Sequence, residues 1–209
     1  NASEFVYGTS DWREVYMDFV PDTLGEATIC CGLGFPWGTY NGGKASGTVW
    51  WDDIRVGPAP DESVYTRESK HIVLKLDRSK VTVSDAAIDA WLSNLDRIYD
   101  AYRNLVGEVP YEGRKILILN TPGIEPGYWA LAGNPILWNS HVAVSPLLER
   151  TVEFDDWGFG ILHEIGHVFS QSNIKGSGRW NWNDEIFANF RMSYALEKCG
   201  GTVSQRNVC

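Results

Sequence analysis

The chain has 209 residues, of which 44% are hydrophobic and 22% are charged, so it can form a packed core and is not of the disordered class. Its formal net charge of −9 argues against a nucleic-acid-binding protein, which needs a basic face, and against an anionic membrane surface as a partner. The longest uncharged run, residues 126–148, contains prolines and polar side chains, so no membrane span is predicted.

The first 57 residues are predicted to form β-strands. Residues 12–20 alternate apolar and polar side chains, which is the pattern of a strand with one buried face. Residues 27–33 and 47–56 are two further expected strands, and a long glycine-rich loop separates them. The ten tryptophans and 21 glycines of the chain also favour a β-rich extracellular protein that binds a ligand.

Two of these segments resemble a jelly-roll carbohydrate-binding module. Trp12-Arg13-Glu14-Val15 and Gly47-Thr48-Val49-Trp50-Trp51-Asp52-Asp53-Ile54-Arg55-Val56 are similar to the strands that close such a sandwich. The resemblance implies a partial β-sandwich over residues 1–57 and a carbohydrate as a partner. A jelly roll needs about eight strands, so we expect this part to be unstable alone. A linker over residues 58–68 follows, because a Gly-Pro-Ala-Pro run opens it.

Residues 69–209 are predicted to form a second domain of the α+β class. Its clearest element is a helix in which apolar residues recur at spacings of three and four, with Ser84 as N-cap and Gly107 just beyond the end. The expected elements are, in chain order, the strand His71–Leu76, the helix Ser84–Val106, the strand Lys115–Asn120, the strand Ile136–Val144, a helix capped by Asp155 and Asp156, and the helix Asn183–Lys198.

The cysteines and the first residues favour a secreted, extracellular protein. Cys199 and Cys209 are expected to form a disulfide, which implies an oxidising compartment, although the four cysteines, with Cys30 and Cys31, allow three connectivities. No cysteine pair has the spacing of a zinc knuckle. Asn1-Ala2-Ser3 matches the acceptor tripeptide for N-linked glycosylation. Because the sequence does not start with Met, we expect a processed or excised segment.

His163-Glu164-Ile165-Gly166-His167 is the most informative motif. Residues four apart share one face of a helix, so His163 and His167 can present both imidazoles to one metal ion. Zinc lowers the pKa of a bound water to about 7, and Glu164 can then accept the proton of that water. The motif therefore predicts one zinc ion and a hydrolytic reaction. Since glycine costs about 1 kcal/mol inside a helix, Gly160 and Gly166 indicate that another segment packs closely there.

A catalytic zinc site needs a third protein ligand. No histidine follows His167, so we expect an acidic side chain from Asp184, Glu185 or Glu197. Glu185 is favoured because it lies in the first turn of the last predicted helix, and Asp184, better explained as the cap of that helix, is held in reserve. Asn189, one turn later, is either a hydrogen-bond partner of a metal-bound histidine or a polar residue on a solvated face.

The same region is similar to the enhancin-like metallopeptidases of the gluzincin group, which include viral enhancins and bacterial mucin-degrading enzymes. Their pattern is H-E-x-G-H, a tryptophan-containing loop and E-x-x-x-N. It is matched by the segment 157–167, by Trp180 and Trp182, and by Glu185-Ile186-Phe187-Ala188-Asn189. Ala132-Gly133-Asn134-Pro135-Ile136 is similar to the A-G-Y-P-I segment of the family, with Asn134 where tyrosine is usual. The chain is short for that family, and we expect a domain truncated after the glutamate ligand.

This resemblance implies a zincin-like metallopeptidase domain, a small sheet plus active-site helices, over residues 69–209. It implies zinc bound by His163, His167 and Glu185, with Glu164 as general base. The strand Ile136–Val144 would be the sheet edge that aligns a peptide substrate. The site is also expected to contain a hydrogen-bond donor to the oxyanion and several substrate-binding residues, although each candidate could instead be a core or loop residue. Candidate donors to the oxyanion are Tyr194, His141 and Tyr128, and the expected substrate-binding residues are Asn134, Ile136, Trp138, Trp180 and Trp182.

The sequence thus predicts a secreted zinc endopeptidase acting on glycosylated or mucin-like proteins. The preference for glycoproteins rests on the two resemblances alone. One alternative is a non-catalytic carbohydrate- or matrix-binding protein with a degenerate or truncated peptidase domain, against which the intact Glu164 argues. A second alternative is a zinc hydrolase of another substrate, such as an aminopeptidase, for which the sequence holds no motif that captures a substrate amine.

Overall fold

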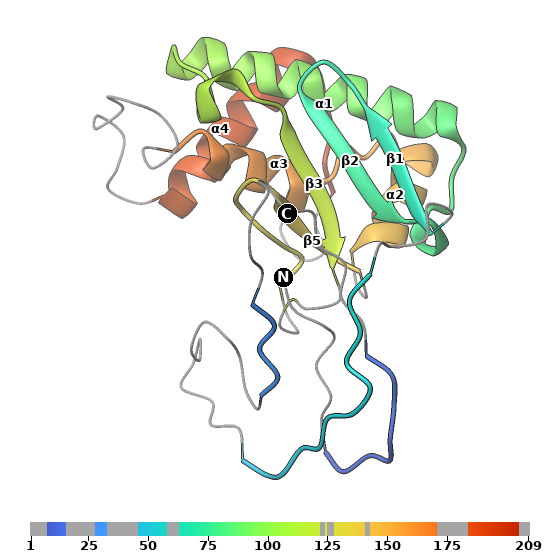
Figure 1. The fold of residues 1–209 in the computed structure, drawn as a ribbon. Coiled ribbons are helices and arrows are strands. Elements are labelled where there is room, and N and C mark those ends of the chain that lie inside the picture. The colour runs from blue at the N-terminus through green and yellow to red at the C-terminus, as the bar shows by residue number, and fades with distance from the viewer. Residues whose placement is uncertain are drawn as a thin grey trace.

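The structure is a computed structural model that describes residues 8–15, 28–32, 46–57, 63–121, 124, 128–140, 143–170 and 184–204. These residues form an α+β fold in which helices pack against one face of a mixed five-stranded sheet (Figure 1). The predicted α+β class is therefore confirmed. None of the described helices has both the length and the apolar character needed to cross a membrane.

The sheet has the strand order β1-β2-β3-β5-β4. β2 (Ile72–Asp77), β3 (Ile116–Thr121) and β5 (Ile136–Asn139) run parallel, whereas β1 (Val64–Glu68) and β4 (Ala130–Leu131) pair antiparallel with β2 and β5. β5 therefore lies inside the sheet and β4 is its edge. The prediction that the β5 segment is the edge strand is wrong, because the short strand β4 pairs with its outer side.

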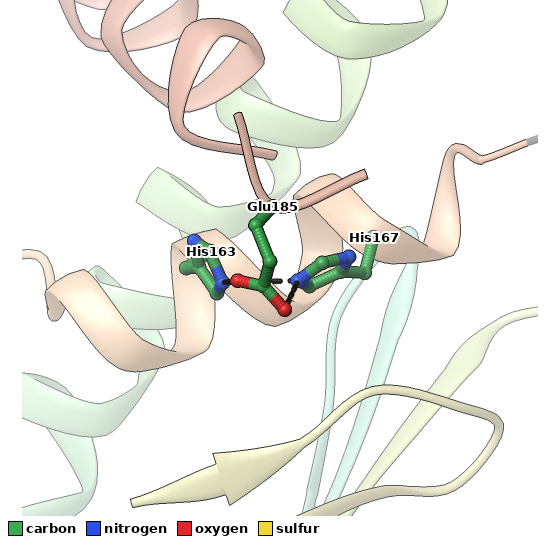
Figure 2. A group of neighbouring side chains, drawn as sticks. All are labelled: His163, His167 and Glu185. Atoms are coloured by element: carbon green, nitrogen blue, oxygen red, sulfur yellow. Dashed lines mark hydrogen bonds and ion pairs between the residues drawn. The ribbon is translucent and has the colours of Figure 1, made fainter. Parts of the chain in front are cut away.

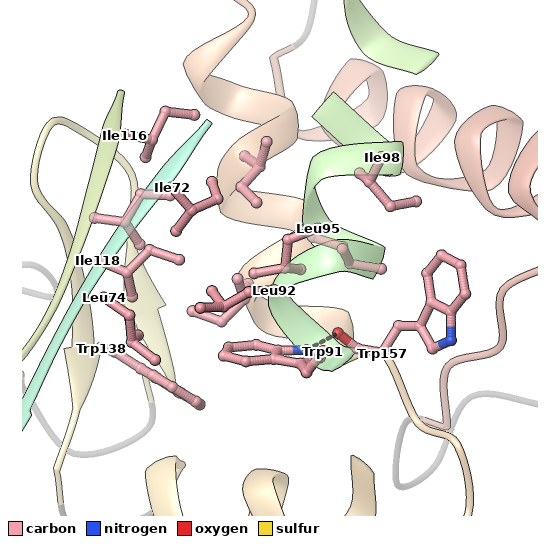
Figure 3. Close-up of a cluster of buried hydrophobic side chains, with 14 of the residues drawn as sticks. Ile72, Leu74, Trp91, Leu92, Leu95, Ile98, Ile116, Ile118, Trp138 and Trp157 are labelled. Atoms are coloured by element: carbon pink, nitrogen blue, oxygen red, sulfur yellow. Dashed lines mark hydrogen bonds between the residues drawn. The ribbon is translucent and has the colours of Figure 1, made fainter. Parts of the chain in front are cut away.

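α1 (Asp85–Val106) connects the parallel strands β2 and β3, and it begins and ends as predicted. The Ser84 hydroxyl accepts a hydrogen bond from the N–H of Ala87 (3.3 Å), and Gly107 ends the helix at φ 85°, a conformation that glycine adopts at little cost. Its buried face packs against the sheet in the core shown in Figure 3. The indole N–H of Trp91 donates to the carbonyl of Trp157 (2.9 Å), which ties α1 to the segment before α3 (Phe159–Val168).

α3 and α4 (Asp184–Cys199) cross at Gly166, as the glycine inside the predicted helix led us to expect. A Cβ atom at Gly166 would lie 2.9 Å from the carbonyl oxygen and 3.1 Å from the Cα atom of Ala188, both backbone atoms. At Gly160, in contrast, a Cβ atom would make an ordinary contact of 3.7 Å with the Trp129 ring. Only Gly166 is therefore required for the close approach of the two helices.

We expect Gly166→Ala to lower the free energy of unfolding by about 1–3 kcal/mol, because the added methyl group collides with backbone that cannot move freely. The matched variant Gly160→Ala should leave it unchanged or raise it by up to about 1 kcal/mol through helix propensity. Urea unfolding of both variants in the presence of a chelator checks this. Equal stability of the two variants would contradict the close crossing at Gly166.

The strands predicted within residues 12–20, 27–33 and 47–56 are not formed where the structure describes them. Residues 12–15, 28–32 and 47–56 have neither helical nor strand conformation, and large apolar side chains such as Trp12 and Trp50 are about 70% exposed (69% and 71%). An alternating pattern supplies an apolar face but no hydrogen-bonded neighbour, and a strand without a neighbour does not persist. The rest of the three segments lies outside the described residues.

Other boundaries also differ from prediction. Residues 64–68 belong to the sheet as β1 and not to a linker, because Tyr65 is buried and the strand pairs with β2. The strand predicted over Ile136–Val144 ends at Asn139, and Val144 is instead the first residue of α2 (Val144–Glu153), a helix that the sequence did not predict; residues 141 and 142 lie outside the described part of the chain. Asp155 and Asp156 do not cap α3, which begins only at residue 159. The buried Asp156 carboxylate instead bonds to Arg150 (3.0 Å) and to the N–H of Gly158 (3.0 Å).

The predicted covalent features fall at the ends of the chain. Cys199 is the last residue of α4, and its Sγ atom lies 3.5 Å from the carbonyl oxygen of Arg97. Cys209 and the tripeptide Asn1-Ala2-Ser3 lie outside the described residues. The disulfide and the glycosylation site therefore stay predictions.

Candidate metal centre

Two helices bring together the three residues predicted to bind metal. His163 and His167 lie one turn apart on α3, and Glu185 lies in the first turn of α4. The Nε2 atoms of the two imidazoles are 2.9 Å apart, and the carboxylate oxygens of Glu185 lie 3.1 Å from His163 Nε2 and 3.4 Å from His167 Nε2. Figure 2 shows the three side chains pointing toward one another. Of the three acidic alternatives, the structure places Glu185 in this group.

The other ring nitrogens face oxygen atoms of α4. His167 Nδ1 lies 2.8 Å from the carboxylate of Asp184, and His163 Nδ1 lies 3.0 Å from the side-chain oxygen of Asn189. A carboxylate only accepts hydrogen bonds, so His167 Nδ1 is the donor of this pair, and His167 Nε2 is the ring nitrogen that faces His163 and Glu185. Asn189 has the partner that the sequence predicted for it. Asp184, the reserve ligand, instead orients a histidine.

These three side chains could hold a metal ion. Two imidazole nitrogens and a carboxylate converge, with their candidate ligand atoms within 4.8 Å of one another, and a cation between them would be attracted by all three. Burial lowers the pKa of His163, and the neighbouring His167 lowers it further, although the bonds to Asn189 and Glu185 partly offset this. The neutral imidazole that a metal requires is thereby favoured. Two histidines and one carboxylate are a recurrent ligand set of catalytic zinc sites.

Glu164 lies in a half-buried position beside His163, His167 and Glu185. Burial, as the largest cause, and the charge of Glu185 together raise the pKa of its carboxyl group to about 7, although the nearby His167 and a hydrogen bond with the Ala132 backbone oppose the shift. A general base works best when its pKa is close to the operating pH. Glu164 therefore has the position and the acidity expected of a group that exchanges protons with a substrate or water.

This shift predicts how stability depends on pH. The folded metal-free chain binds the Glu164 proton more tightly than the unfolded chain, so its free energy of unfolding falls between pH 4.5 and about pH 7. We expect Glu164→Gln, which removes this titration, to be more stable than the wild type by about 3 kcal/mol at pH 8 and by less than about 1 kcal/mol at pH 5. Urea unfolding at the two pH values, with chelator present, measures the difference. An equal difference at both values would contradict the burial of the ionised carboxylate.

A cavity of about 580 Å³ opens on the cluster. α3 and the start of α4 form one wall, and the edge strand β4 with the following Ala132 and Gly133 forms another. Four aromatic side chains contribute to the lining: Tyr111, Tyr128, Trp129 and Phe159. The Phe159 ring stacks on that of His163 with 5.7 Å between the ring centres. The cavity is thus a partly apolar cleft with its titratable groups on one side, as is typical of small-molecule and peptide sites.

Three of the expected substrate-binding residues make structural contacts in the core or within the sheet and its loops. Ile136 and Trp138 are buried in the core, with exposures of 0% and 2%, and Trp138 packs against Trp91. The Asn134 side chain accepts a hydrogen bond from the N–H of Leu117 (2.8 Å) and donates to the carbonyl of Lys115 (3.2 Å), so it joins its loop to β3. The substrate-binding assignment of Ile136 and Trp138 is therefore corrected, because both side chains are buried in the core, whereas that of Asn134 stays a prediction.

The candidate oxyanion donors separate in the structure. Tyr128 lines the cavity, whereas Tyr194 does not and lies nine residues beyond Glu185, about 13 Å along the axis of α4. The Tyr194 ring instead lies beneath the ammonium group of Lys198 (5.6 Å). His141, Trp180 and Trp182 lie outside the described residues, and their roles stay predictions.

Several cavity residues were not predicted. Tyr111 is more than 50 positions upstream of the motif and takes a left-handed conformation, with φ 50° and ψ 35°. Trp129 and Phe159 flank predicted features, but tryptophan and phenylalanine are usual core residues. The sequence signal that could have pointed to the cavity is the position of Trp129, shortly before the Ala132-Gly133-Asn134-Pro135 run.

The comparisons with known proteins show a distant relationship of fold. No protein-family profile matches the chain, and no curated protein matches its sequence. The structure is similar to the crystal structure of a functionally unknown conserved protein, in a mutant form, from Bacillus anthracis str. Ames, with a TM-score of 0.51 and 15% identity. The match covers 69% of this chain and 30% of that one. This similarity supports the fold and gives no information about the activity of this chain.

Proposed function

We propose that this chain is a zinc-dependent endopeptidase with a zincin-like domain of the gluzincin group. The observation that carries the proposal is the convergence of His163 Nε2, His167 Nε2 and the Glu185 carboxylate beside the half-buried Glu164. Zinc, when bound, polarises a water molecule and the carbonyl group of the substrate. The intact general base argues against the non-catalytic alternative.

Glu164 supplies the proton transfers in this proposal. Its carboxylate takes a proton from the attacking water and passes it to the nitrogen of the leaving amine. The hydrogen bond with the Ala132 backbone holds the carboxylate near the sheet edge, where the peptide would lie. Tyr128, which lines the cavity, is the described candidate for a hydrogen bond to the oxyanion.

An extended peptide is the substrate that best suits the cavity. β4 is an edge strand, and an extended peptide can add to such an edge through main-chain hydrogen bonds. The aromatic rings of Tyr111 and Trp129 lie in the same cavity and offer contact area to apolar side chains or sugar rings. Secretion, a carbohydrate-binding module and the preference for glycosylated or mucin-like proteins are proposed from the sequence resemblances.

Cleavage assays test this function. The zinc-loaded chain is incubated with casein and with a mucin, each followed by mass spectrometry of the fragments, and the mucin is used with and without its glycans. We expect internal cleavage that a chelator stops and that zinc restores, with the glycosylated mucin cut faster. Zinc binding without cleavage of any substrate would contradict the proposal and favour the carbohydrate- or matrix-binding alternative.

A further inference from the structure

A buried arginine lies next to the residues that support the candidate metal ligands. Arg191, on α4, is only 5% exposed, and its guanidinium lies over the ring of Phe187, 5.6 Å from the ring centre. A buried cation is costly unless it is paired and hydrogen-bonded. Its partners therefore show what it holds in place.

One partner is the backbone of the helix that carries the histidines. Arg191 Nη1 donates to the carbonyl oxygen of Gly166 (2.9 Å), the residue immediately before His167. In a continued helix that carbonyl would accept from the N–H of Ser170, but this N–H bonds to the carbonyl of His167 instead (2.8 Å). Arg191 thus satisfies a carbonyl group left open at the end of α3, where a positive charge is favoured.

The second partner is the carboxylate that orients His167. Arg191 Nη1 lies 3.7 Å from one oxygen of Asp184, and the other oxygen of Asp184 lies 2.8 Å from His167 Nδ1. The same guanidinium therefore fixes both the backbone before His167 and the acceptor of the His167 ring proton. On α1, the Tyr102 hydroxyl similarly donates to the carbonyl of Leu162 (2.9 Å), the residue before His163.

We propose that Arg191 is a positioning residue of the metal centre, which acts through Asp184 and Gly166 to hold the His167 ring with Nε2 directed at the metal. This inference rests on the proposed zinc site. It extends that site to a side chain that touches neither metal nor substrate. Partners in this outer position typically change metal affinity by about 10–100-fold when they are removed.

Zinc affinity, measured by competition with a chelator, tests the inference. We expect Arg191→Met to raise the zinc dissociation constant about 10–100-fold. The matched control is Arg150→Met, which breaks the pair with the buried Asp156 (3.0 Å). Neither residue of that pair lines the cavity or belongs to the ligand group, so the variant should destabilise the fold without changing zinc affinity. If Arg191→Met does not fold, Arg191→Lys replaces it, because lysine keeps the charge but not the planar fork. Zinc affinity that changes no more than in Arg150→Met would overturn the proposal.

Two further readouts separate positioning from general support. If Arg191 acts through Asp184, combining Arg191→Met with Asp184→Asn should weaken zinc binding less than the sum of the two single effects. In the zinc-free chain, nitrogen NMR of the His167 ring should show the Nδ1-protonated tautomer in the wild type and a mixture in Arg191→Met. An unchanged tautomer overturns the inference even if zinc binds, whereas absence of zinc binding by the wild type overturns the proposed function itself.

Discussion

Replacing Glu164 by glutamine is expected to lower kcat/KM for peptide hydrolysis by about 10²–10⁴-fold, the usual contribution of a positioned general base. Glutamine has the same shape and keeps an oxygen that can accept the hydrogen bond from the Ala132 backbone, but it cannot take up a proton. Zinc affinity should stay close to that of the wild type, because Glu164 is not among the three converging ligands. Initial rates on casein, with the zinc content of each sample, measure both quantities.

The matched control for that experiment is Glu197→Gln, which neutralises an exposed carboxylate on α4 and should retain full activity. Wild-type activity in Glu164→Gln would mean that another group accepts the proton. Loss of zinc in Glu164→Gln would instead mean that the carboxylate supports the metal and not the proton transfer.

Replacing Glu185 by alanine is expected to weaken zinc binding by more than the roughly 10–100-fold that loss of an outer hydrogen-bond partner costs. The carboxylate is the sole anionic member of the described ligand group, and its two oxygens lie 3.1 Å and 3.4 Å from the two Nε2 atoms. Its removal leaves two imidazoles, too few for a stable catalytic site. Competition with a chelator gives the dissociation constant.

Two variants calibrate that result. Asp184→Asn should weaken zinc binding less than Glu185→Ala, because Asp184 contacts the Nδ1 atom of His167 and not the metal side of the ring. Glu197→Ala should leave zinc binding unchanged. Zinc affinity that survives Glu185→Ala, or that falls equally in Glu197→Ala, would remove Glu185 from the ligand set.

Local sequence signals predicted the elements whose physical causes are themselves local. The apolar spacing of α1, with Ser84 before it and Gly107 after it, lies within one segment, and the helix has nearly the predicted ends. The pairing of His163 with His167 likewise follows from the pitch of a single helix. Gly166 could be linked to close packing from its place inside a helix, although not to its neighbour Ala188.

Features that depend on contacts between distant segments could not be predicted in the same way. The segment of β1 is polar on one face and its local sequence predicts a linker, because only its pairing with β2 makes it a strand. β4 has two residues and becomes the edge only through the order of the whole sheet. Residues 47–56 show the opposite error: their pattern predicts a strand, but the structure has none there, since alternation alone supplies no partner. Tyr111 reaches the cavity through tertiary structure, without a motif.

X-ray absorption at the zinc edge tests the central claim most directly. Zinc-loaded protein should hold one zinc ion per chain, with nitrogen and oxygen scatterers at about 2.0–2.2 Å and with the multiple-scattering pattern of two imidazoles. The His163→Ala variant should lose this spectrum. Absence of bound zinc, or a sulfur scatterer at about 2.3 Å that indicates a cysteine ligand, would contradict a centre built from His163, His167 and Glu185.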